Sequence, residues 1–374
     1  MLIALNEKNE PVRADSAPIG AQYCCPACKG KVILKKGELK ISHFSHWRNQ
    51  LCSKRTESET EEHLRGKLDL MRWAHKRLGE TKLEYYIPAI RQRTDLLIVH
   101  NNYWFAIEFQ CSPLPVASVQ SRTEGYISIG LPVVWISGNK LKLSRKPTAL
   151  HCALMNETGS GELYFLHYDQ SSCQLMVYHS FHSLKGYFSF SSRYIHFGSE
   201  VDATSVKQVE IQSYVLQAPS VAKNRLKQLY RFKLHQDSRY RQFFELLYTS
   251  RLSLESMPEA LLHPVAREWM IRTVPQEWKL LLLKWIVALP EKQILTQKLI
   301  DRQRVQWTES GKIDFYCFPN VSSSALNRPL IDFLKLLAAL SVLDSLGEGK
   351  WRVNRKCRTI RMLSKTNECI ITDF

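Results

Sequence analysis

Hydrophobic residues between positions 56 and 136 follow first a helical and then a strand pattern. Leu64, Leu68 and Met71 recur at helical spacing and predict an amphipathic helix over 56–78. The remaining predicted elements are a strand at 83–87, two β-rich runs on either side of 100–103, a helix over 116–129 and a buried strand at 131–136. This order, α-β-β-β-α-β, predicts an α/β sheet covered by helices.

The pattern changes twice along the rest of the chain. Short β-rich runs joined by turn residues occur between 160 and 195, and long amphipathic helices are predicted from about 215 onward. An apolar segment runs from Leu330 to Leu346 and stops at Gly347. We therefore expect four domains: a small N-terminal one over 1–54, an α/β core over 55–150, a β-rich extension over 151–214 and a mostly helical domain over 215–374.

Two acidic residues belong to the predicted hairpin. If Asn101 and Asn102 form a two-residue turn, paired residue numbers sum to 203 and Asp95 lies opposite Glu108. Opposed residues have Cβ atoms roughly 5 Å apart, where two like charges are destabilising. A cation between them would remove that repulsion, and Mg²⁺ prefers carboxylate oxygens and water. The sequence thus predicts a divalent metal site, with Gln110 on the same strand face as Glu108.

The two flanking helices offer further candidate site residues. Glu59, His63 and Lys67 are spaced four residues apart, so they share one stripe of the first helix. A solvated helix face is the alternative explanation of that spacing. On the second helix, Arg122 could bind a phosphate in a bidentate manner, whereas Tyr126 is equally suited to packing.

Cysteines and histidines cluster near the start of the chain. Cys25-x₂-Cys28 is followed by His43-x₂-His46, which provides the four nitrogen and sulfur ligands of a tetrahedral zinc site. Cys24 and Cys52 are competing thiols, and Cys52 could replace one histidine. The alternative is that reduced cysteines lie beside incidental histidines. A closed four-ligand site would be structural, because it leaves no position open for chemistry.

Charge extends this prediction to partners. The chain has 52 Lys and Arg against 35 Asp and Glu, a formal net charge of +17, which favours a polyanionic partner and nucleic acid before membrane. Five basic residues with aromatic neighbours form a candidate nucleic-acid surface, with a merely solvated helix face as the alternative: Lys223, Arg225, Lys227, Arg231 and Lys233. No signal peptide or membrane span is evident, so we expect a cytoplasmic protein.

An ordered set of motifs resembles the PD-(D/E)xK nuclease superfamily and, more narrowly, the competence protein CoiA family. The motifs lie within about residues 20–140: Cys25-Pro-Ala-Cys28, His43-Phe-Ser-His46, Glu59…His63…Lys67, Arg93-Thr-Asp95, Ala106-Ile-Glu-Phe-Gln-Cys-Ser112, Arg122…Tyr126 and Val133-Val-Trp-Ile136. The resemblance implies a restriction-endonuclease-like core. It also implies a role in processing or recombining DNA taken up during natural transformation.

The resemblance also assigns roles to the acidic hairpin. By position, Asp95 and Glu108 would bind Mg²⁺ or Mn²⁺, while Gln110 occupies the place of the superfamily lysine. This departure removes one positive charge, for which Lys67 or Arg122 could substitute. Three functions follow as expectations. They are a metal-dependent DNA nuclease, a non-catalytic DNA-binding mediator that recruits recombination proteins, and an RNA-directed nuclease.

Overall fold

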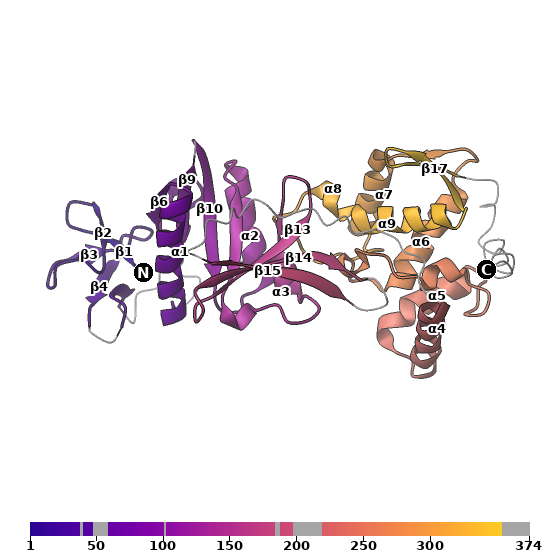
Figure 1. Cartoon of the computed structure of the whole chain (residues 1–374), viewed down its shortest axis with the longest axis horizontal. Helices are drawn as coiled ribbons and strands as arrows, with labels where there is room; N and C mark the ends of the chain where they lie inside the picture. Colours follow the sequence, from indigo (N-terminus) through magenta and orange to yellow (C-terminus); the bar gives the residue numbers. More distant parts are fainter. Residues whose placement is uncertain (38–39, 48–58, 101, 184–187, 197–218, 354–374) are drawn as a thin grey trace. The chain divides into compact units, whose positions relative to one another are not determined.

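The computed structural model describes residues 1–37, 40–47, 59–100, 102–183, 188–196 and 219–353 (Figure 1). The chain divides into two compact units. The first comprises Met1–His179, Ser192–Val206 and Cys317–Asn320, and the second comprises Ser180–Ser191, Lys207–Tyr316 and Val321–Phe374. The finer division into four domains stays a prediction. Among the described residues, no helix is long and apolar enough to cross a membrane.

The first unit begins with a small five-stranded sheet in the order β2-β1-β3-β4-β5. The strands are β1 (Ile3–Leu5), β2 (Pro11–Arg13), β3 (Tyr23–Cys24), β4 (Lys31–Lys35) and β5 (His43–His46), and all their pairings are antiparallel. Tyr23, Val32 and Phe44 are buried together as its own core. This sheet positions the predicted zinc ligands on β5 and on the turn between β3 and β4.

A second, eight-stranded sheet forms most of the first unit. Its order is β15-β14-β13-β11-β10-β9-β6, with β12 paired to β13, and the β10–β11 and β11–β13 pairings are parallel. The strands are β6 (Glu80–Leu83), β9 (Leu96–His100), β10 (Tyr103–Gln110), β11 (Val133–Ser137), β12 (Asn156–Glu157), β13 (Leu163–Asp169), β14 (Gln174–His182) and β15 (Ser189–His196). β7 (Tyr86–Ile87) and β8 (Gln92–Arg93) form a separate antiparallel pair.

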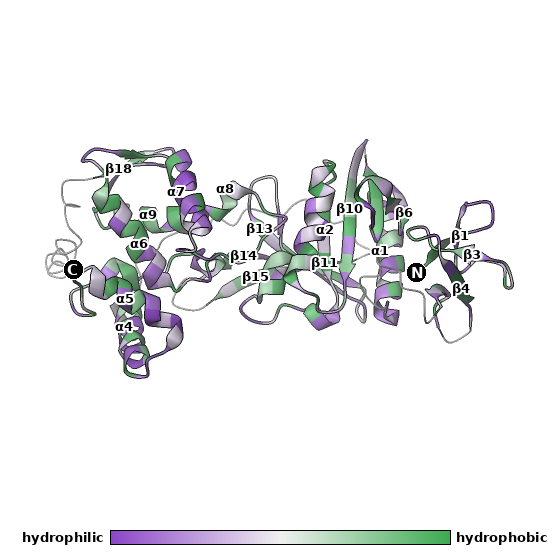
Figure 2. Cartoon of the chain, turned by 180° about the vertical axis from the view of Figure 1, so that it is seen from behind, coloured by the Kyte–Doolittle hydropathy of each residue, from purple (hydrophilic) through white to green (hydrophobic). Residues whose placement is uncertain are grey.

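Two helices cover opposite faces of this sheet near β10. α1 (Glu61–Arg77) buries Leu64 and Leu70 in one core cluster with Ile107 and Phe109, whose side chains project from the same face of β10. Side chains on the other face of the sheet point toward α2 (Val116–Ser128). One of them is Trp135 of β11, whose indole donates to the Thr123 hydroxyl at 3.0 Å. A short α3 (Ala149–Ala153) completes the helices described in this unit. Hydrophobic residues dominate the central strands (Figure 2).

The hairpin register agrees with the predicted turn, and two other predicted boundaries in this unit were wrong. Pairing runs from His100↔Tyr103 to Leu96↔Ile107, so paired numbers sum to 203. Thr60 caps α1 by accepting from the N–H of His63, which places Glu59 before the helix. Residues 56–58 lie outside the described residues. The predicted strand 83–87 is interrupted at Glu84, whose positive φ of 50° breaks extended structure.

The second unit is mostly helical, as predicted, and holds one large apolar core. Its helices are α4 (Pro219–Leu234), α5 (Arg241–Thr249), α6 (Pro275–Ala288), α7 (Gln297–Glu309), α8 (Ser323–Leu326) and α9 (Arg328–Ala339). A small sheet has the order β16-β18-β17, from Ile294–Leu295, Lys350–Val353 and Leu343–Gly347. The predicted apolar segment 330–346 is therefore divided, because α9 ends at Ala339 and a strand follows. Trp278 and Phe333 are fully buried in the core.

Candidate functional site

Asp95 lies just before β9 and faces residues of α1. Its Oδ2 accepts the backbone N–H of Phe109 at 2.9 Å and lies 3.3 Å from Nε2 of His63. Its Oδ1 lies 3.7 Å from the ammonium nitrogen of Lys67, which is fully buried. Burial alone would raise the pKa of Asp95, but His63 and Lys67 reverse that effect and hold the pKa well below its usual value. Asp95 is therefore an ionised carboxylate.

Glu108 lies on β10 and is contacted from α2. Its Oε1 accepts hydrogen bonds from the Arg122 guanidinium and from the Tyr126 hydroxyl. The same Nη2 of Arg122 donates to the backbone carbonyl of Arg93 at 3.2 Å, so Arg122 links Glu108 of β10 to the end of β8. Burial raises the pKa of Glu108, Arg122 opposes that shift, and the negative charge of Asp95 adds to it. The two carboxylates are thus close enough to repel each other.

Each of these carboxylates keeps one oxygen without a hydrogen bond among the described residues. For Asp95 it is Oδ1, which has only the Lys67 ammonium at 3.7 Å, and for Glu108 it is Oε2. Two oxygens at one end of a hairpin suit a divalent cation, since Mg²⁺ is commonly held by one or two carboxylates with water completing its shell. The donor set present therefore fits the predicted ion.

Lys67 belongs to a buried charge network that sequence reasoning only partly identified. Its ammonium contacts the carboxylate of Glu84 and lies 3.1 Å from Glu59. Arg93 contacts the same two acids, at 2.9 Å from Glu59 and 3.8 Å from Glu84, and the Met1 amino group also pairs with Glu59. Although burial favours the neutral amine, Glu84 and Glu59 raise the pKa of Lys67 above its usual value. Lys67 is therefore a fixed cation and no proton acceptor.

Glu84 is the site residue that the sequence analysis missed. Its side chain is fully buried, and its Oε2 accepts the backbone N–H groups of Leu2 and Ile3, which ties the start of the chain to this network. The available signal was an acid placed inside the apolar run Leu83-Glu84-Tyr85-Tyr86-Ile87. A buried acid of that kind requires cationic partners.

Gln110, which was predicted to take the place of the superfamily lysine, is engaged with the local backbone. Its Nε2 donates to the carbonyl of Ser112 at 2.7 Å. The predicted stripe of Glu59, His63 and Lys67 does converge on the hairpin, because Lys67 contacts Glu59 and both His63 and Lys67 approach Asp95. The alternative explanation of a solvated helix face is wrong for Lys67, since this side chain is fully buried.

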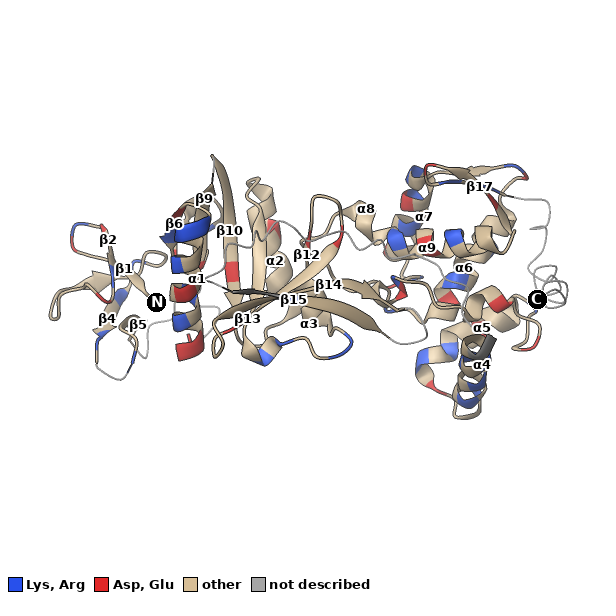
Figure 3. Cartoon of the chain, viewed as in Figure 1, with Lys and Arg blue, Asp and Glu red and all other residues tan. Residues whose placement is uncertain are grey.

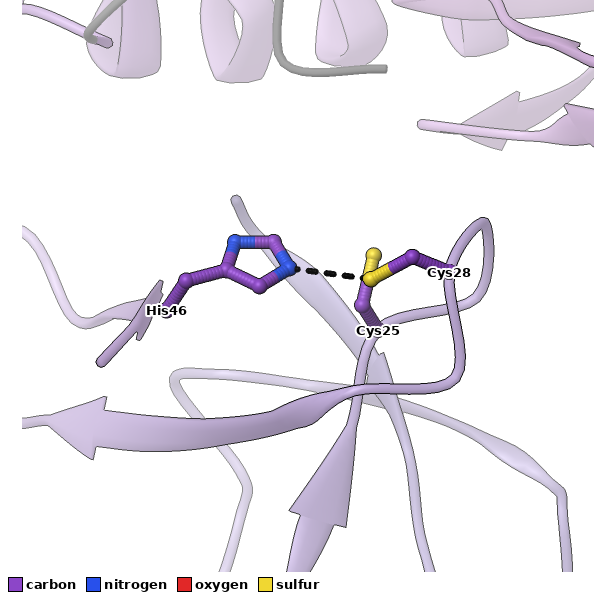
Figure 4. Close-up of side chains that lie close together, drawn as sticks. All are labelled: Cys25, Cys28 and His46. Carbon is purple, nitrogen blue, oxygen red and sulfur yellow. Dashed lines mark hydrogen bonds between the residues drawn. The ribbon is translucent and has the colours of Figure 1, made fainter. Parts of the chain in front are cut away.

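Three of the four predicted zinc ligands lie together. Ligand atoms of Cys25, Cys28 and His46 all lie within 4.8 Å of one another, and Nε2 of His46 is 3.3 Å from the Cys28 sulfur (Figure 4). His43 does not lie with them, because residues three apart on β5 project from opposite faces and its Nδ1 lies 2.8 Å from the carbonyl of Ile41. Cys52, the alternative ligand, lies outside the described residues.

The five predicted phosphate-binding residues lie on α4, where Lys and Arg residues recur along the helix (Figure 3). Lys223, Lys227, Arg231 and Lys233 are exposed, as a nucleic-acid surface requires. Arg225 differs, because its guanidinium is bound to the buried carboxylate of Glu268. Arg225 is therefore an anchored cation, which exposes only part of its side chain.

Comparisons with known proteins identify a family that the chain resembles. Two family models match the chain and together cover more than half of it. "Competence protein CoiA, nuclease-like domain" matches residues 59–218, and "Competence protein CoiA, N-terminal domain" matches residues 8–55. A relative, "Competence protein CoiA" of Bacillus subtilis (strain 168), is 35% identical over 117 residues. That match covers 31% of this chain and 31% of the relative, and no solved structure is significantly similar.

Proposed function

This chain belongs to the competence protein CoiA family, and we propose that it is a metal-dependent nuclease that acts on DNA. Its core would be of the restriction-endonuclease-like PD-(D/E)xK type. Its role would be to process DNA taken up during natural transformation, or to promote recombination of that DNA. The nuclease-like description of the matching family model and the word competence in the relative's name support this proposal.

One observation supports the activity most directly, namely the free oxygen on each of Asp95 and Glu108. These two residues would hold Mg²⁺ or Mn²⁺. Such an ion activates water for attack on a phosphodiester and neutralises the charge that develops on phosphate. A DNA phosphate would add an oxygen from outside the protein, which suits a site with only two acidic side chains.

Nearby residues would support this chemistry through fixed positive charge. The pKa of Arg122 lies above its usual range because Glu108 outweighs the effect of burial, so Arg122 stays charged beside Glu108. Lys67 stays charged beside Asp95 for the same kind of reason. Gln110 supplies an amide where the superfamily has an ammonium, so these two cations would replace the missing charge. Tyr126 would hold the Glu108 carboxylate in position through its hydroxyl.

A structural zinc ion would complete the first unit. Cys25, Cys28 and His46 offer two soft sulfur ligands and one imidazole, a donor set that zinc prefers. Such an ion would fix the turn between β3 and β4 against β5. No part of the proposed phosphodiester chemistry requires it.

The alternative is a DNA-binding mediator that recruits recombination proteins and has a degenerate nuclease core. Two observations favour it: Gln110 replaces the lysine, and each acid already has internal cationic partners. Under this alternative, the ion pairs would be structural and the acids would contribute to stability alone. An RNA-directed nuclease is the third function, and the net charge of +17 suits RNA equally well.

A cleavage assay separates these functions. Single-stranded, duplex and branched DNA and single-stranded RNA would be incubated with Mg²⁺, with Mn²⁺ or with EDTA. We expect metal-dependent cleavage of DNA, and a loss of about 100-fold or more in Glu108→Gln with unchanged DNA affinity. Glu124→Gln, which changes an exposed acid on helix α2, the helix that supplies Arg122 and Tyr126, is the matched control and should cleave normally. If no substrate is cleaved with either metal, the mediator function is correct, and cleavage of RNA alone would identify the third.

A further inference from the structure

A cavity of about 290 Å³ lies between α4 and the first turn of α6, within the second unit. Its lining is unusually rich in groups that recognise nucleotides. Three amide side chains, one guanidinium and two aromatic rings contribute to it: Asn224, Gln228, Gln276, Arg225, Phe232 and Tyr240. The volume is at the lower end of the range for small-molecule sites, which suits a single nucleotide.

The wall of the cavity that holds Arg225 has an excess of positive charge. Arg225 pairs with Glu268, and the fully buried Lys279 donates to the same carboxylate at 2.8 Å. Two cations thus share one acid. The first turn of α6 lies beside them, with Pro275 at its start, and the N-terminal end of a 14-residue helix adds partial positive charge. This wall therefore favours an anionic group such as a phosphate.

Gln276 provides an independent indication that the cavity receives a ligand. The residue is 4% exposed, it lines the cavity, and its Oε1 has no hydrogen-bond partner within the described part of the chain. Leaving a buried polar atom unpaired is unfavourable, because the atom loses its hydrogen bonds to water and gains none in the protein. A ligand that donates a hydrogen bond to this amide would remove that cost, and the exocyclic amines of nucleobases are such donors.

The aromatic residues and the surrounding helix face suit the same ligand. Phe232 and Tyr240 stack with ring centroids 4.4 Å apart and an interplanar angle of 16°. Aromatic rings of this kind accept a further base by stacking, whatever its sequence. The exposed cations Lys223, Lys227 and Lys233 stand on the same helix, where they would neutralise the phosphates on either side of the bound nucleotide.

We infer that this cavity binds one unpaired nucleotide of a nucleic-acid strand. The base would lie against the amides and the aromatic pair, and its phosphate would lie near Arg225 and the start of α6. All the residues that line the cavity belong to the second unit, so the inference goes beyond the proposed nuclease site and does not require cleavage. A free mononucleotide has the same chemistry, and the experiment distinguishes the two sources.

Binding would be measured on the full chain in EDTA, with Asp95→Asn as the background, so that nuclease activity does not affect the result. Fluorescence anisotropy would compare a labelled mixed-sequence single strand of 20 nucleotides with the duplex of the same sequence. We expect Gln276→Met and Asn224→Ala each to weaken single-strand binding by roughly tenfold and to leave duplex binding unchanged. Lys233→Gln, outside the cavity lining, is the control and should weaken both substrates equally.

Two further measurements keep the inference testable if Gln276→Met does not fold. Gln228 is exposed at the cavity, so Gln228→Ala should fold and show the same selective loss. A 5-iodouracil-substituted strand should photo-crosslink to the peptide that contains Phe232 or Tyr240. Adenosine monophosphate would be titrated separately, and a response that Gln276→Met abolishes would support the cavity but identify a free nucleotide as its ligand. Equal loss for single strand and duplex, or crosslinks only elsewhere, would overturn the inference.

Discussion

The backbone N–H of Phe109 donates to Oδ2 of Asp95 at 2.9 Å, so a side chain continues the pairing of β10 beyond the point where β9 begins. Asp95 therefore combines a structural bond with the proposed chemistry. Asp95→Asn keeps an acceptor but loses the charge, whereas Asp95→Ala loses both. We expect both variants to lose Mg²⁺-dependent cleavage, and only the alanine variant to lose a further 1–3 kcal/mol or so in unfolding free energy. Urea denaturation alongside the cleavage assay checks this, and an asparagine variant that cleaves like wild type contradicts the assigned role.

Gln110→Lys should leave the fold intact and keep or raise cleavage, because under the proposed PD-(D/E)xK assignment it restores the positive charge of the superfamily lysine. The new ammonium could still donate to the carbonyl of Ser112, as the amide does now at 2.7 Å. Gln110→Met has similar length without charge and serves as the control, which should not exceed wild type. Initial cleavage rates at saturating Mg²⁺ measure the effect. A lysine variant that folds normally but is inactive would show that the role given to Gln110 is wrong.

Zinc content should distinguish the two histidines of β5. We expect about one zinc per chain in the wild-type protein, its loss in Cys25→Ser/Cys28→Ser, and a marked reduction in His46→Ala. His43→Ala should retain the ion, because His43 projects from the opposite face of the strand. Elemental analysis of the purified variants gives the answer. The geometry described above is refuted if His43→Ala, and not His46→Ala, loses zinc.

Stability should depend on pH through Glu277, whose pKa burial raises from 4.5 to about 7. The folded state holds this proton more tightly than the unfolded state does. The stabilisation that protonated Glu277 gives the folded state is therefore complete below pH 4.5 and is lost as pH rises toward 7. Glu277→Gln should lack this slope and exceed wild type by about 3 kcal/mol at most at pH 8. Unfolding free energies between pH 4 and 8 test it, with the exposed Glu309→Gln on α7 as a control that keeps the wild-type slope.

Gly66→Ala should destabilise the protein, because a Cβ at this position would lie 2.2 Å from the Phe109 ring. Overpacking of this kind costs about 1–3 kcal/mol, which exceeds the gain of roughly 1 kcal/mol from alanine in a helix. Phe109→Leu should cost less in the Gly66→Ala background than in wild type, and a double-mutant cycle measures this coupling. Gly159→Ala, which meets open space, is the control. Additive effects of the two substitutions would contradict direct contact between them.

Sequence reasoning succeeded where the signal was local and periodic. The hairpin register followed from a two-residue turn between two β-rich runs, and the amphipathic pattern identified α1 and α2. Sequence reasoning failed where contacts between residues far apart in the chain determine which side chains form the site. Glu84 is separated by 17 residues from Lys67 and by 82 from Leu2, yet both are its hydrogen-bond partners. No spacing rule within the chain predicts those contacts.

One of the four predicted zinc ligands, His43, lies apart from the others for a different reason. His43 and His46 have the spacing of a ligand pair on a helix or a turn, but β5 is a strand, and alternation turns one of them away. The sequence motif alone does not distinguish these cases. A prediction that combined the motif with the strand-like segment Ile41-Ser-His-Phe-Ser-His46 would have assigned one histidine as a zinc ligand and left the fourth ligand unassigned.

The contact between Gly66 and Phe109 has a consequence for how relatives of this chain can diverge. Neither residue has an ionisable group, yet Gly66 lies on α1 between His63 and Lys67, so a larger side chain there would push the helix away from the Phe109 ring and both partners away from Asp95. A lineage that enlarges the glycine has to shrink the ring in step, or its charged partners move apart. Covariation of these two positions would therefore report on conservation of volume at the helix–sheet boundary, separately from conservation of the acids.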